Sequence, residues 1–244
     1  MEFNNINIDC KKRLAKDIRQ IMKNPLYDHG IYYHHDDNNI LNGYALIIGT
    51  EDTPYFGGYY FFKFTFTNQY PYSPPIVTFC TNDNNIRFHP NFYKCGKVCI
   101  SLLNTWTGDQ WTSCHNISSI LLTLASLITK DSLLHEPGIS DKKQIREYNE
   151  IIEFENINIS ICEVLSGKIP SFNKWFLHFS EPILEHFLKN KEKINSLIEK
   201  KLKSDDKKKK IILKTYFITS NIDFALLKIK INKLDIDNSI YKKK

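Results

Sequence analysis

The pattern of apolar and polar residues changes its period several times along the chain. From residue 7 to residue 23, apolar side chains recur at helical spacing while most basic ones fall elsewhere, which predicts an amphipathic helix. Asn24-Pro25 ends this helix, because proline disfavours a helical conformation in the residue before it. Beyond Ile31 the runs shorten, with turn residues such as Asn42-Gly43 and Gly57-Gly58 between them. The candidate strands are residues 31–33, 44–49, 59–66 and 76–80, and their short connections predict a four-stranded antiparallel meander.

Helices are expected in the second half of the chain. Residues 82–115 have no clean period, and irregular stretches of this length inside a compact domain are usually functional. We expect helices at 116–129, at 142–166 with an interruption near Asn156, and at 171–203, whereas 211–241 fits a helix and a strand equally well. The predicted fold class is therefore α+β. We place a core domain at residues 1–168 and a basic, mainly helical C-terminal extension at residues 169–244, with the boundary at Gly167 and Pro170.

Composition narrows the class of protein. No apolar run approaches the roughly 18 to 20 residues that span a bilayer, and the first residues lack the features of a secretory signal. We therefore expect a soluble protein of the cytoplasm, the nucleus or both, with no membrane partner. Residues 1–168 hold 15 Lys and Arg against 18 Asp and Glu, a net charge of −3, whereas residues 169–244 hold 18 against 9, a net charge of +9. An acidic partner would suit the extension, but a solvated lysine-rich surface is the simpler interpretation, and nucleic acid is not expected.

The chain has six cysteines, and free thiols are the better interpretation of them in a protein without a secretory signal. One alternative is a zinc site, because Cys95, Cys99, Cys114 and His115 form a Cys-x₃-Cys-x₁₄-Cys-His run. Adjacent Cys and His ligands fit the usual structural sites poorly, and no Cys-x₂-Cys knuckle is present. We therefore expect no metal and no cofactor.

The segment from His89 to Leu103 carries the candidate chemistry. A cysteine acts as a nucleophile through its thiolate, and acyl transfer then needs a donor for the developing oxyanion. Asn91 precedes Cys99 by eight residues, Pro90 holds the backbone beside Asn91, and Gly96 allows a sharp bend between them. His89 could be a general base, but a structural role in a turn, donating to a backbone carbonyl, is the favoured interpretation. From these residues alone, a buried structural Cys99 and a nucleophilic Cys99 are equally tenable.

Several motifs together resemble the ubiquitin-conjugating enzymes. The resemblance covers about residues 7–168, and the stretches near residues 104–111, 135–138 and 148–150 are similar to a large Z-type subfamily that also has a C-terminal extension. The motifs are Thr53-Pro54-Tyr55-Phe56-Gly57-Gly58 with the aromatic strand after it, Tyr70-Pro71-Tyr72-Ser73-Pro74-Pro75, His89-Pro90-Asn91, Gly96-Lys97-Val98-Cys99-Ile100-Ser101, and Trp111.

The resemblance implies a fold and a mechanism. The fold is an N-terminal helix, a four-stranded antiparallel meander and C-terminal helices. Cys99 would accept ubiquitin or a ubiquitin-like modifier from an activating enzyme as a thioester, and would pass it to a substrate lysine or to a ligase. Asn91 matches the family asparagine that stabilises the oxyanion or orders the loop. Family members often carry an acid after the second helix, where Glu136 is the best match for activating the lysine and His135 the next.

The resemblance also implies partner surfaces. Lys11, Lys12 and Arg13 match the family site for the activating enzyme, while Tyr72 and Ser113 match ligase-contact positions, where many members have proline in place of Ser113. His89, Pro90, Gly96 and Trp111 would shape or border the site. Two alternatives remain: a conjugating enzyme for a ubiquitin-like modifier only, and a non-catalytic binding variant of the fold. The presence of Cys99 argues against the second.

Overall fold

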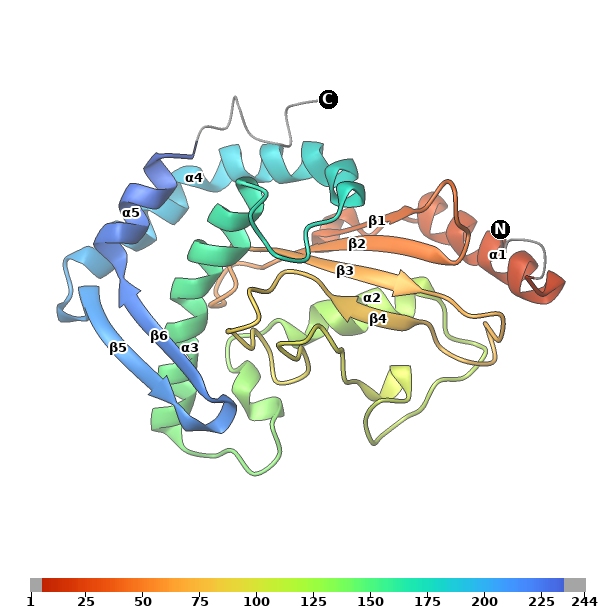
Figure 1. The fold of residues 1–244 in the computed structure, drawn as a ribbon, viewed down its shortest axis with the longest axis horizontal. Coiled ribbons are helices and arrows are strands. Elements are labelled where there is room, and N and C mark those ends of the chain that lie inside the picture. The colour runs from red at the N-terminus through yellow and green to blue at the C-terminus, as the bar shows by residue number, and fades with distance from the viewer. Residues whose placement is uncertain (1–5, 235–244) are drawn as a thin grey trace.

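The computed structural model of the chain describes residues 6–234 (Figure 1). It confirms the predicted order of one helix, a four-stranded sheet and further helices. The helices are α1 (Ile8–Lys23), α2 (Ile117–Leu127), α3 (Lys142–Glu155), α4 (Ser180–Leu202) and α5 (Phe224–Asn232), and the strands are β1 (Ile31–His35), β2 (Asn42–Ile48), β3 (Tyr59–Thr65), β4 (Ile76–Phe79), β5 (Lys208–Leu213) and β6 (Ile218–Asp223). Within the described residues, no helix is both long and apolar enough to cross a membrane.

The predicted meander forms one antiparallel sheet in the order β1-β2-β3-β4. Its register pairs Ile31 with Ile47, Ile48 with Tyr59, and Phe62 with Phe79. The turn before β3 requires glycine, because Gly57 has a φ of +77° and a Cβ on Gly58 would lie 1.9 Å from Asn156 Oδ1.

Both faces of β3 are buried. Successive strand residues point to opposite faces of a sheet, and the Tyr59-Tyr60-Phe61-Phe62 run fills both. On one face Phe62 packs against Phe92 of the loop before Cys99, with ring centroids 5.3 Å apart. On the other face Phe61 stacks on Phe176 at 4.2 Å, and Phe176 belongs to a 3₁₀ helix, Lys174–Phe179, of the C-terminal extension. The extension therefore completes the core of the sheet.

The interruption expected near Asn156 is a π-helical segment, Asn156–Glu163, that continues α3. The side chain of Asn156 is buried and donates to the carbonyl of Phe56 at 2.8 Å, while it accepts from the Tyr60 hydroxyl at 2.6 Å. These bonds give a buried amide its partners at the place where the helix widens.

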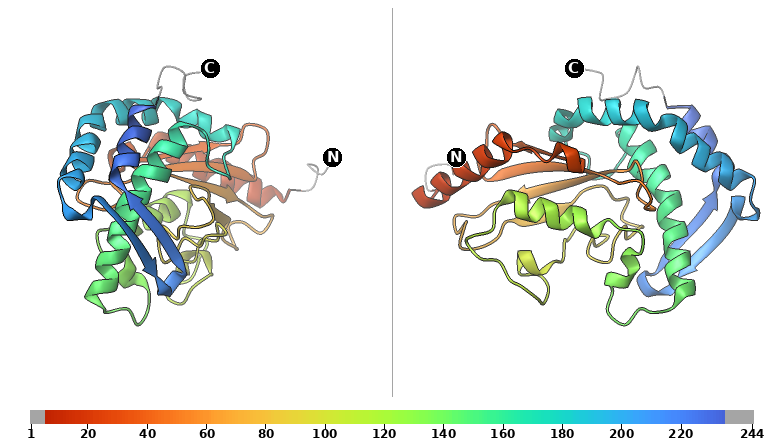
Figure 2. Two further views of the ribbon diagram at one scale, coloured as in Figure 1. Left: turned by 60° about the vertical axis from the view of Figure 1, so that its left-hand side comes forward. Right: turned by 180° about the vertical axis from the view of Figure 1, so that it is seen from behind.

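The extension contains the helices α4 and α5, and residues 208–223 add the β5–β6 hairpin, which lies mostly in the stretch whose pattern fits a helix and a strand equally well. This hairpin packs on α3, which stands between it and the four-stranded sheet (Figures 1 and 2). The ambiguous stretch begins at Ile211, inside β5, and packing against α3 decides there in favour of a strand with alternating exposed and buried side chains. Residues 235–241 of the ambiguous stretch lie outside the described part of the chain.

Opposite charges join the extension to the core. Lysines of α4, β5 and α5 reach three glutamates of α3 and its π-helical continuation. The pairs are Lys201–Glu153 at 2.5 Å, Lys209–Glu150 at 2.8 Å and Lys230–Glu163 at 2.6 Å. Part of the positive charge of the extension thus has an acidic partner within the same chain, and the attraction is partly shielded from solvent because the side chains are half-buried.

We predict that Phe176→Ala lowers the free energy of unfolding by about 3–5 kcal/mol, because it removes a buried ring from the contact between extension and sheet. Phe217→Ala is the matched control: its ring is 90% exposed, and we expect a change within about 0.5 kcal/mol. Denaturant unfolding measures both. Equal losses for the two variants would contradict the packing described for the extension.

Candidate active site

Asn91 and Cys99 hold each other across a tight turn. The backbone N–H of Cys99 donates to the carbonyl of Asn91 at 2.9 Å, and the side-chain Nδ2 of Asn91 donates to the carbonyl of Cys99 at 2.5 Å. Gly96 makes the turn possible: it has a φ of +87°, and a Cβ there would lie 2.9 Å from the carbonyl oxygen of Phe79. The sequence expectation of a bend at Gly96 is confirmed. The pair is therefore fixed through both main chain and side chain.

The Cys99 thiol is covered by the loop that follows it. Its side chain is 4% exposed, and Sγ donates to the carbonyl of Thr105 at 2.7 Å. Thr105 is itself held, because its hydroxyl accepts from the Ile100 N–H at 2.9 Å. Sequence reasoning missed Thr105, for which no local signal exists.

The other cysteines differ from Cys99 in their surroundings. Burial raises the pKa of the Cys80 and Cys162 thiols to about 12 and also raises the pKa of the Cys10 thiol, which makes the thiolate form of each less available. Cys95 and Cys114 are exposed. Among residues 6–234, no group of three or more His, Cys, Asp or Glu side chains is arranged to hold a metal ion, and this includes Cys95, Cys99, Cys114 and His115.

His89 is buried beneath the turn. Its Nδ1 accepts from the backbone N–H of Asn91 at 3.0 Å, and its Nε2 lies 3.0 Å from Nδ1 of His135. Burial, with a smaller contribution from the neighbouring His135, lowers the pKa of His89 to about 3. The neutral ring therefore supports Asn91 by accepting from its backbone amide, and the ring also forms a hydrogen bond with the backbone of Leu127. This arrangement favours the structural role over the general base.

Trp111 links the loop after Cys99 to the loop before β4. Its indole Nε1 donates to the carbonyl of Pro71 at 2.7 Å, and its backbone N–H donates to the side chain of Asn104 at 2.9 Å. The indole is buried and packs beside Tyr70. Trp111 thus steadies the neighbourhood of the site through Asn104, which follows Cys99 by five residues.

Glu136 faces the extension. Its Oε2 accepts from the hydroxyl of Tyr216, in the β5–β6 turn, at 2.7 Å, and lies 4.0 Å from the guanidinium of Arg87. The contacts of this carboxylate are with Tyr216 and Arg87 and not with Cys99. The carboxylate is therefore already engaged, which weakens the assignment of Glu136 to lysine activation. Sequence reasoning also missed Arg87 and Tyr216, because their meeting depends on residues more than a hundred positions apart.

The predicted partner-binding residues lie in two environments. Lys11, Lys12, Tyr72 and Ser113 are exposed. Arg13 is not part of a free basic face: its guanidinium contacts Asp17 at 2.9 Å and donates to the carbonyls of Ser113 and His115, both at 2.5 Å. The Asp17 carboxylate also accepts from the Tyr70 hydroxyl. Arg13 therefore ties α1 to the loop that holds Ser113, and its ion-pair partner Asp17 ties α1 to Tyr70, near Tyr72 in the other loop.

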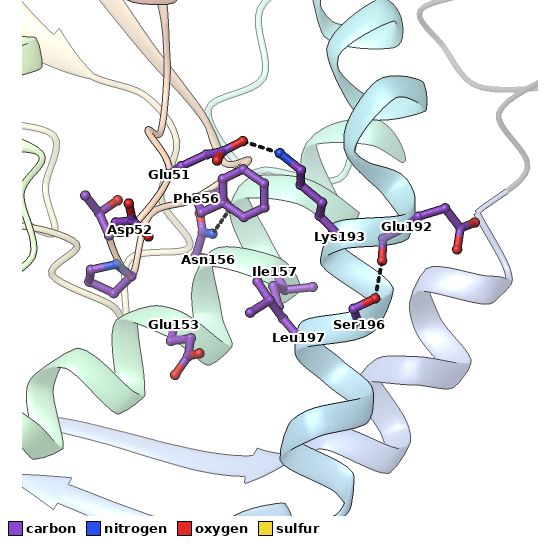
Figure 3. Close-up of a pocket in the computed structure, with 12 residues that line it drawn as sticks. Glu51, Asp52, Phe56, Glu153, Asn156, Ile157, Glu192, Lys193, Ser196 and Leu197 are labelled. Atoms are coloured by element: carbon purple, nitrogen blue, oxygen red, sulfur yellow. Dashed lines mark hydrogen bonds and ion pairs between the residues drawn. The ribbon is translucent and has the colours of Figure 1, made fainter.

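Two hollows lie near these elements. One of about 440 Å³ is lined by residues 74–78, 95–98, Leu103 and Thr105, next to the carbonyl that holds the Cys99 thiol. A second, of about 460 Å³, lies between the 51–56 loop, α3 and α4, where Lys193 and Glu51 form an ion pair across its rim (Figure 3). None of the candidate site residues lines the second hollow.

Comparison with known proteins identifies relatives. Residues 13–161 match the family model described as ubiquitin-conjugating enzyme. The chain is 40% identical over 165 residues to the human protein named ubiquitin-conjugating enzyme E2 Z. The aligned region covers 66% of this chain and 46% of the human protein. The chain is 40% identical over 163 residues to the Xenopus tropicalis protein of the same name, covering 65% and 51% respectively. A Caenorhabditis elegans protein named probable ubiquitin-conjugating enzyme protein 17 is 36% identical over 200 residues, covering 76% and 26%. The chain spans about half the length of the E2 Z relatives it matches and about a quarter of the Caenorhabditis elegans protein.

The lowered pKa of His89 predicts an acid-sensitive fold. The unfolded state binds one more proton at this ring between about pH 6.5 and pH 3, so its stabilising effect is full above that window and falls as the pH drops. From pH 7 to pH 5 this site should remove about 2 kcal/mol from the free energy of unfolding. Urea unfolding at both pH values should show a smaller loss for His89→Asn than for the wild type. The control His29→Asn, at an exposed histidine, should lose as much free energy of unfolding between pH 7 and pH 5 as the wild type. An equally large loss in His89→Asn would contradict the lowered pKa of His89.

Proposed function

Because the chain belongs to the ubiquitin-conjugating enzyme family, we propose that Cys99 accepts ubiquitin or a ubiquitin-like modifier from an activating enzyme as a thioester, and passes it to a substrate lysine or to a ligase. The observation that carries this proposal is the two-way bracing of Asn91 and Cys99. It holds an amide donor beside the one thiol that lies in the motif of the family. The relatives are longer proteins, so the modifier, partners and substrates belong to the proposal.

The chemistry follows from the residues at the turn. The Cys99 thiolate attacks the carbonyl carbon of the incoming thioester, and negative charge develops on the carbonyl oxygen. The activating enzyme's sulfur then leaves as a thiolate, and the new thioester bond is on Cys99. In the second half-reaction a neutral lysine amine attacks, an amide bond forms and the Cys99 thiolate leaves. Both steps pass through an oxyanion, and both gain from a fixed donor.

Asn91 can serve both steps without giving up its structural bond. A side-chain amide has two N–H donors, and one of them is used on the carbonyl of Cys99. The second N–H is available to an oxyanion formed at Cys99. Because the first bond holds the amide in place beforehand, little reorganisation is needed when charge develops. Bracing the loop and donating to the oxyanion are thus two uses of one fixed group.

The acceptor lysine must lose a proton before it attacks. Glu136 is the sequence candidate for this role, but its Oε2 accepts from Tyr216. A base at this position would have to release that hydroxyl or act through its other oxygen. Proton removal by Glu136 therefore requires a rearrangement at this carboxylate, whereas acyl transfer uses Cys99 and Asn91 where they stand.

The exposed face of α1 and the loop residues define the proposed docking sites. Lys11 and Lys12 present positive charge for the activating enzyme, and Tyr72 and Ser113 are open to a ligase. The Arg13–Asp17 pair acts in this proposal as the link that holds the α1 site and both loops in one arrangement. A panel of activating enzymes and modifiers, tested for thioester formation, identifies the cognate pair.

We predict that Cys99→Ser forms an oxyester adduct that thiol reductant does not cleave, because the hydroxyl replaces the thiol as acceptor. The reaction contains an activating enzyme, ATP and modifier, and gels with and without reductant report the adduct. Cys95→Ser is the matched control, since Cys95 is exposed and four residues away; it should give the reducible adduct of the wild type. Loss of the reducible adduct in the Cys95 variant, or its persistence in the Cys99 variant, would contradict the assignment.

Asn91→Ala should slow the discharge of the Cys99 thioester to free lysine by about a hundred- to a thousand-fold, the usual effect of removing an oxyanion donor. Single-turnover discharge after quenching of the activating enzyme measures this rate. Asn85→Ala, a change at an exposed asparagine six residues earlier, should discharge at the wild-type rate. Wild-type discharge by the folded Asn91 variant would rule out a catalytic role for this amide.

A further inference from the structure

Arg87 lies between two aromatic rings beside the active-site turn. Its guanidinium carbon is 3.9 Å from the ring centroid of Tyr93, which lies between Asn91 and Cys99, and 4.3 Å from that of Tyr216. The same guanidinium donates through Nε to the carbonyl of Pro90 at 3.0 Å and through an Nη to the same oxygen. Arg87 thus grips the peptide group that joins Pro90 to Asn91.

Tyr216 comes from the turn between β5 and β6 and is fixed from several sides. Its ring is buried and meets Tyr148 of α3 edge to face, with centroids 6.1 Å apart. Its hydroxyl donates to Glu136 at 2.7 Å. The neighbouring Thr215 donates to Gln144 of α3 at 2.9 Å. Figure 1 shows this turn at the end of the hairpin, beside the first turns of α3.

A second contact joins the hairpin turn to the active-site loop. The ammonium of Lys94 donates to the carbonyl of Phe217 at 3.2 Å, and Lys94 lies in the same turn as Gly96. Phe217 has a φ of +51°, a conformation that residues other than glycine adopt infrequently and that closes the tip of the hairpin. The hairpin therefore reaches the segment between Asn91 and Cys99 at both Tyr93 and Lys94.

We propose that Tyr216 is a positioning residue for the reaction at Cys99: its ring, together with Tyr93, holds Arg87 against the carbonyl of Pro90 and so fixes Asn91. This inference rests on the proposed function. An arginine side chain loses considerable rotamer freedom when it is held in one place, and two stacked rings restrict it before substrate arrives. Because a displacement of a catalytic group by about 1 Å can cost a large factor in rate, the grip on Pro90 matters for Asn91.

The proposal gives the C-terminal extension a part in catalysis and explains the contacts of Glu136. The carboxylate holds the Tyr216 hydroxyl and lies 4.0 Å from the Arg87 guanidinium, so it orients the ring and balances the charge in the clamp. The clamp thus consists of Arg87, Tyr93, Glu136 and Tyr216. Three of these come from the core, and the hairpin supplies the fourth.

The first test compares three variants of the full chain in single-turnover discharge of the thioester to free lysine. Tyr216→Ala removes the stacked ring and should slow discharge about tenfold. Tyr216→Phe keeps the ring and should stay within about twofold of the wild type, because stacking carries most of the effect. Phe217→Ala, next in the chain with a 90% exposed ring, should leave the rate unchanged. Discharge by Tyr216→Ala at the wild-type rate would overturn the proposal.

A double-mutant cycle separates positioning from a merely structural role. If Tyr216 acts through Asn91, Tyr216→Ala should slow discharge by less than about twofold when Asn91 is already alanine. Equal slowing in both backgrounds would mean that Tyr216 affects the reaction by another route, and the proposal would fail. Arg87→Lys keeps the charge but loses the planar fork, and it should reproduce the rate and the non-additivity of Tyr216→Ala; it carries the test if the tyrosine variant does not fold.

Amide hydrogen exchange tests the clamp without any activity. The backbone N–H groups of Asn91 and Cys99 should exchange faster in folded Tyr216→Ala or Arg87→Lys than in the wild type, and Phe217→Ala should match the wild type. Unchanged exchange at both amides would overturn the proposal even if discharge were slowed. Failure of the wild type to form any thioester would instead count against the proposed function, while the exchange result would still decide whether the clamp fixes Asn91.

Discussion

The mutual hydrogen bonding of Asn91 and Cys99 is the constraint on which the site depends. It brings a side-chain amide and a thiol together from positions eight residues apart, and it needs the left-handed bend at Gly96 to close. The surrounding contacts converge on these two residues. The buried His89 accepts a hydrogen bond from the backbone N–H of Asn91, and Arg87 donates to the carbonyl of Pro90, the residue before Asn91. A neutral donor fixed in a partly buried setting can stabilise developing charge without first having to move, which is the physical basis of the proposed reaction.

The sheet supports this turn on one face and carries the C-terminal extension on the other. The aromatic residues of β3 alternate between Phe92, which lies inside the active-site loop, and Phe176, which belongs to the extension. Ion pairs along α3 add to this contact and use part of the extension's positive charge. The same extension then returns to the site through the β5–β6 turn. Core and extension are thus joined by apolar packing, by charge and by the contacts of Tyr216.

Local patterns predicted the parts of the structure that local patterns control. The α1 helix, the four strands, the bend at Gly96 and the interruption near Asn156 follow from period and turn chemistry. The hairpin could not be predicted in this way, because the stretch from Ile211 onward suits two conformations and its packing on α3 decides between them. The meeting of Tyr216 with Glu136, and the use of Arg13 to bind two backbone carbonyls, depend on residues 80 and about 100 positions apart. One signal was present and unused: the unbroken aromatic run in β3 indicated that both faces of the sheet are covered.

The central claim is that Cys99, among six cysteines, is the residue that carries the modifier. Mass spectrometry of the wild-type protein, quenched at acid pH after reaction with an activating enzyme, ATP and a modifier, tests it directly by locating the bond. The account predicts one adduct, with the modifier's C-terminal residue on the peptide that contains Cys99, and its loss after treatment with a thiol reductant. An adduct formed first on Cys95, on Cys114 or on a lysine, or no adduct with any activating enzyme that is itself charged, would contradict the account.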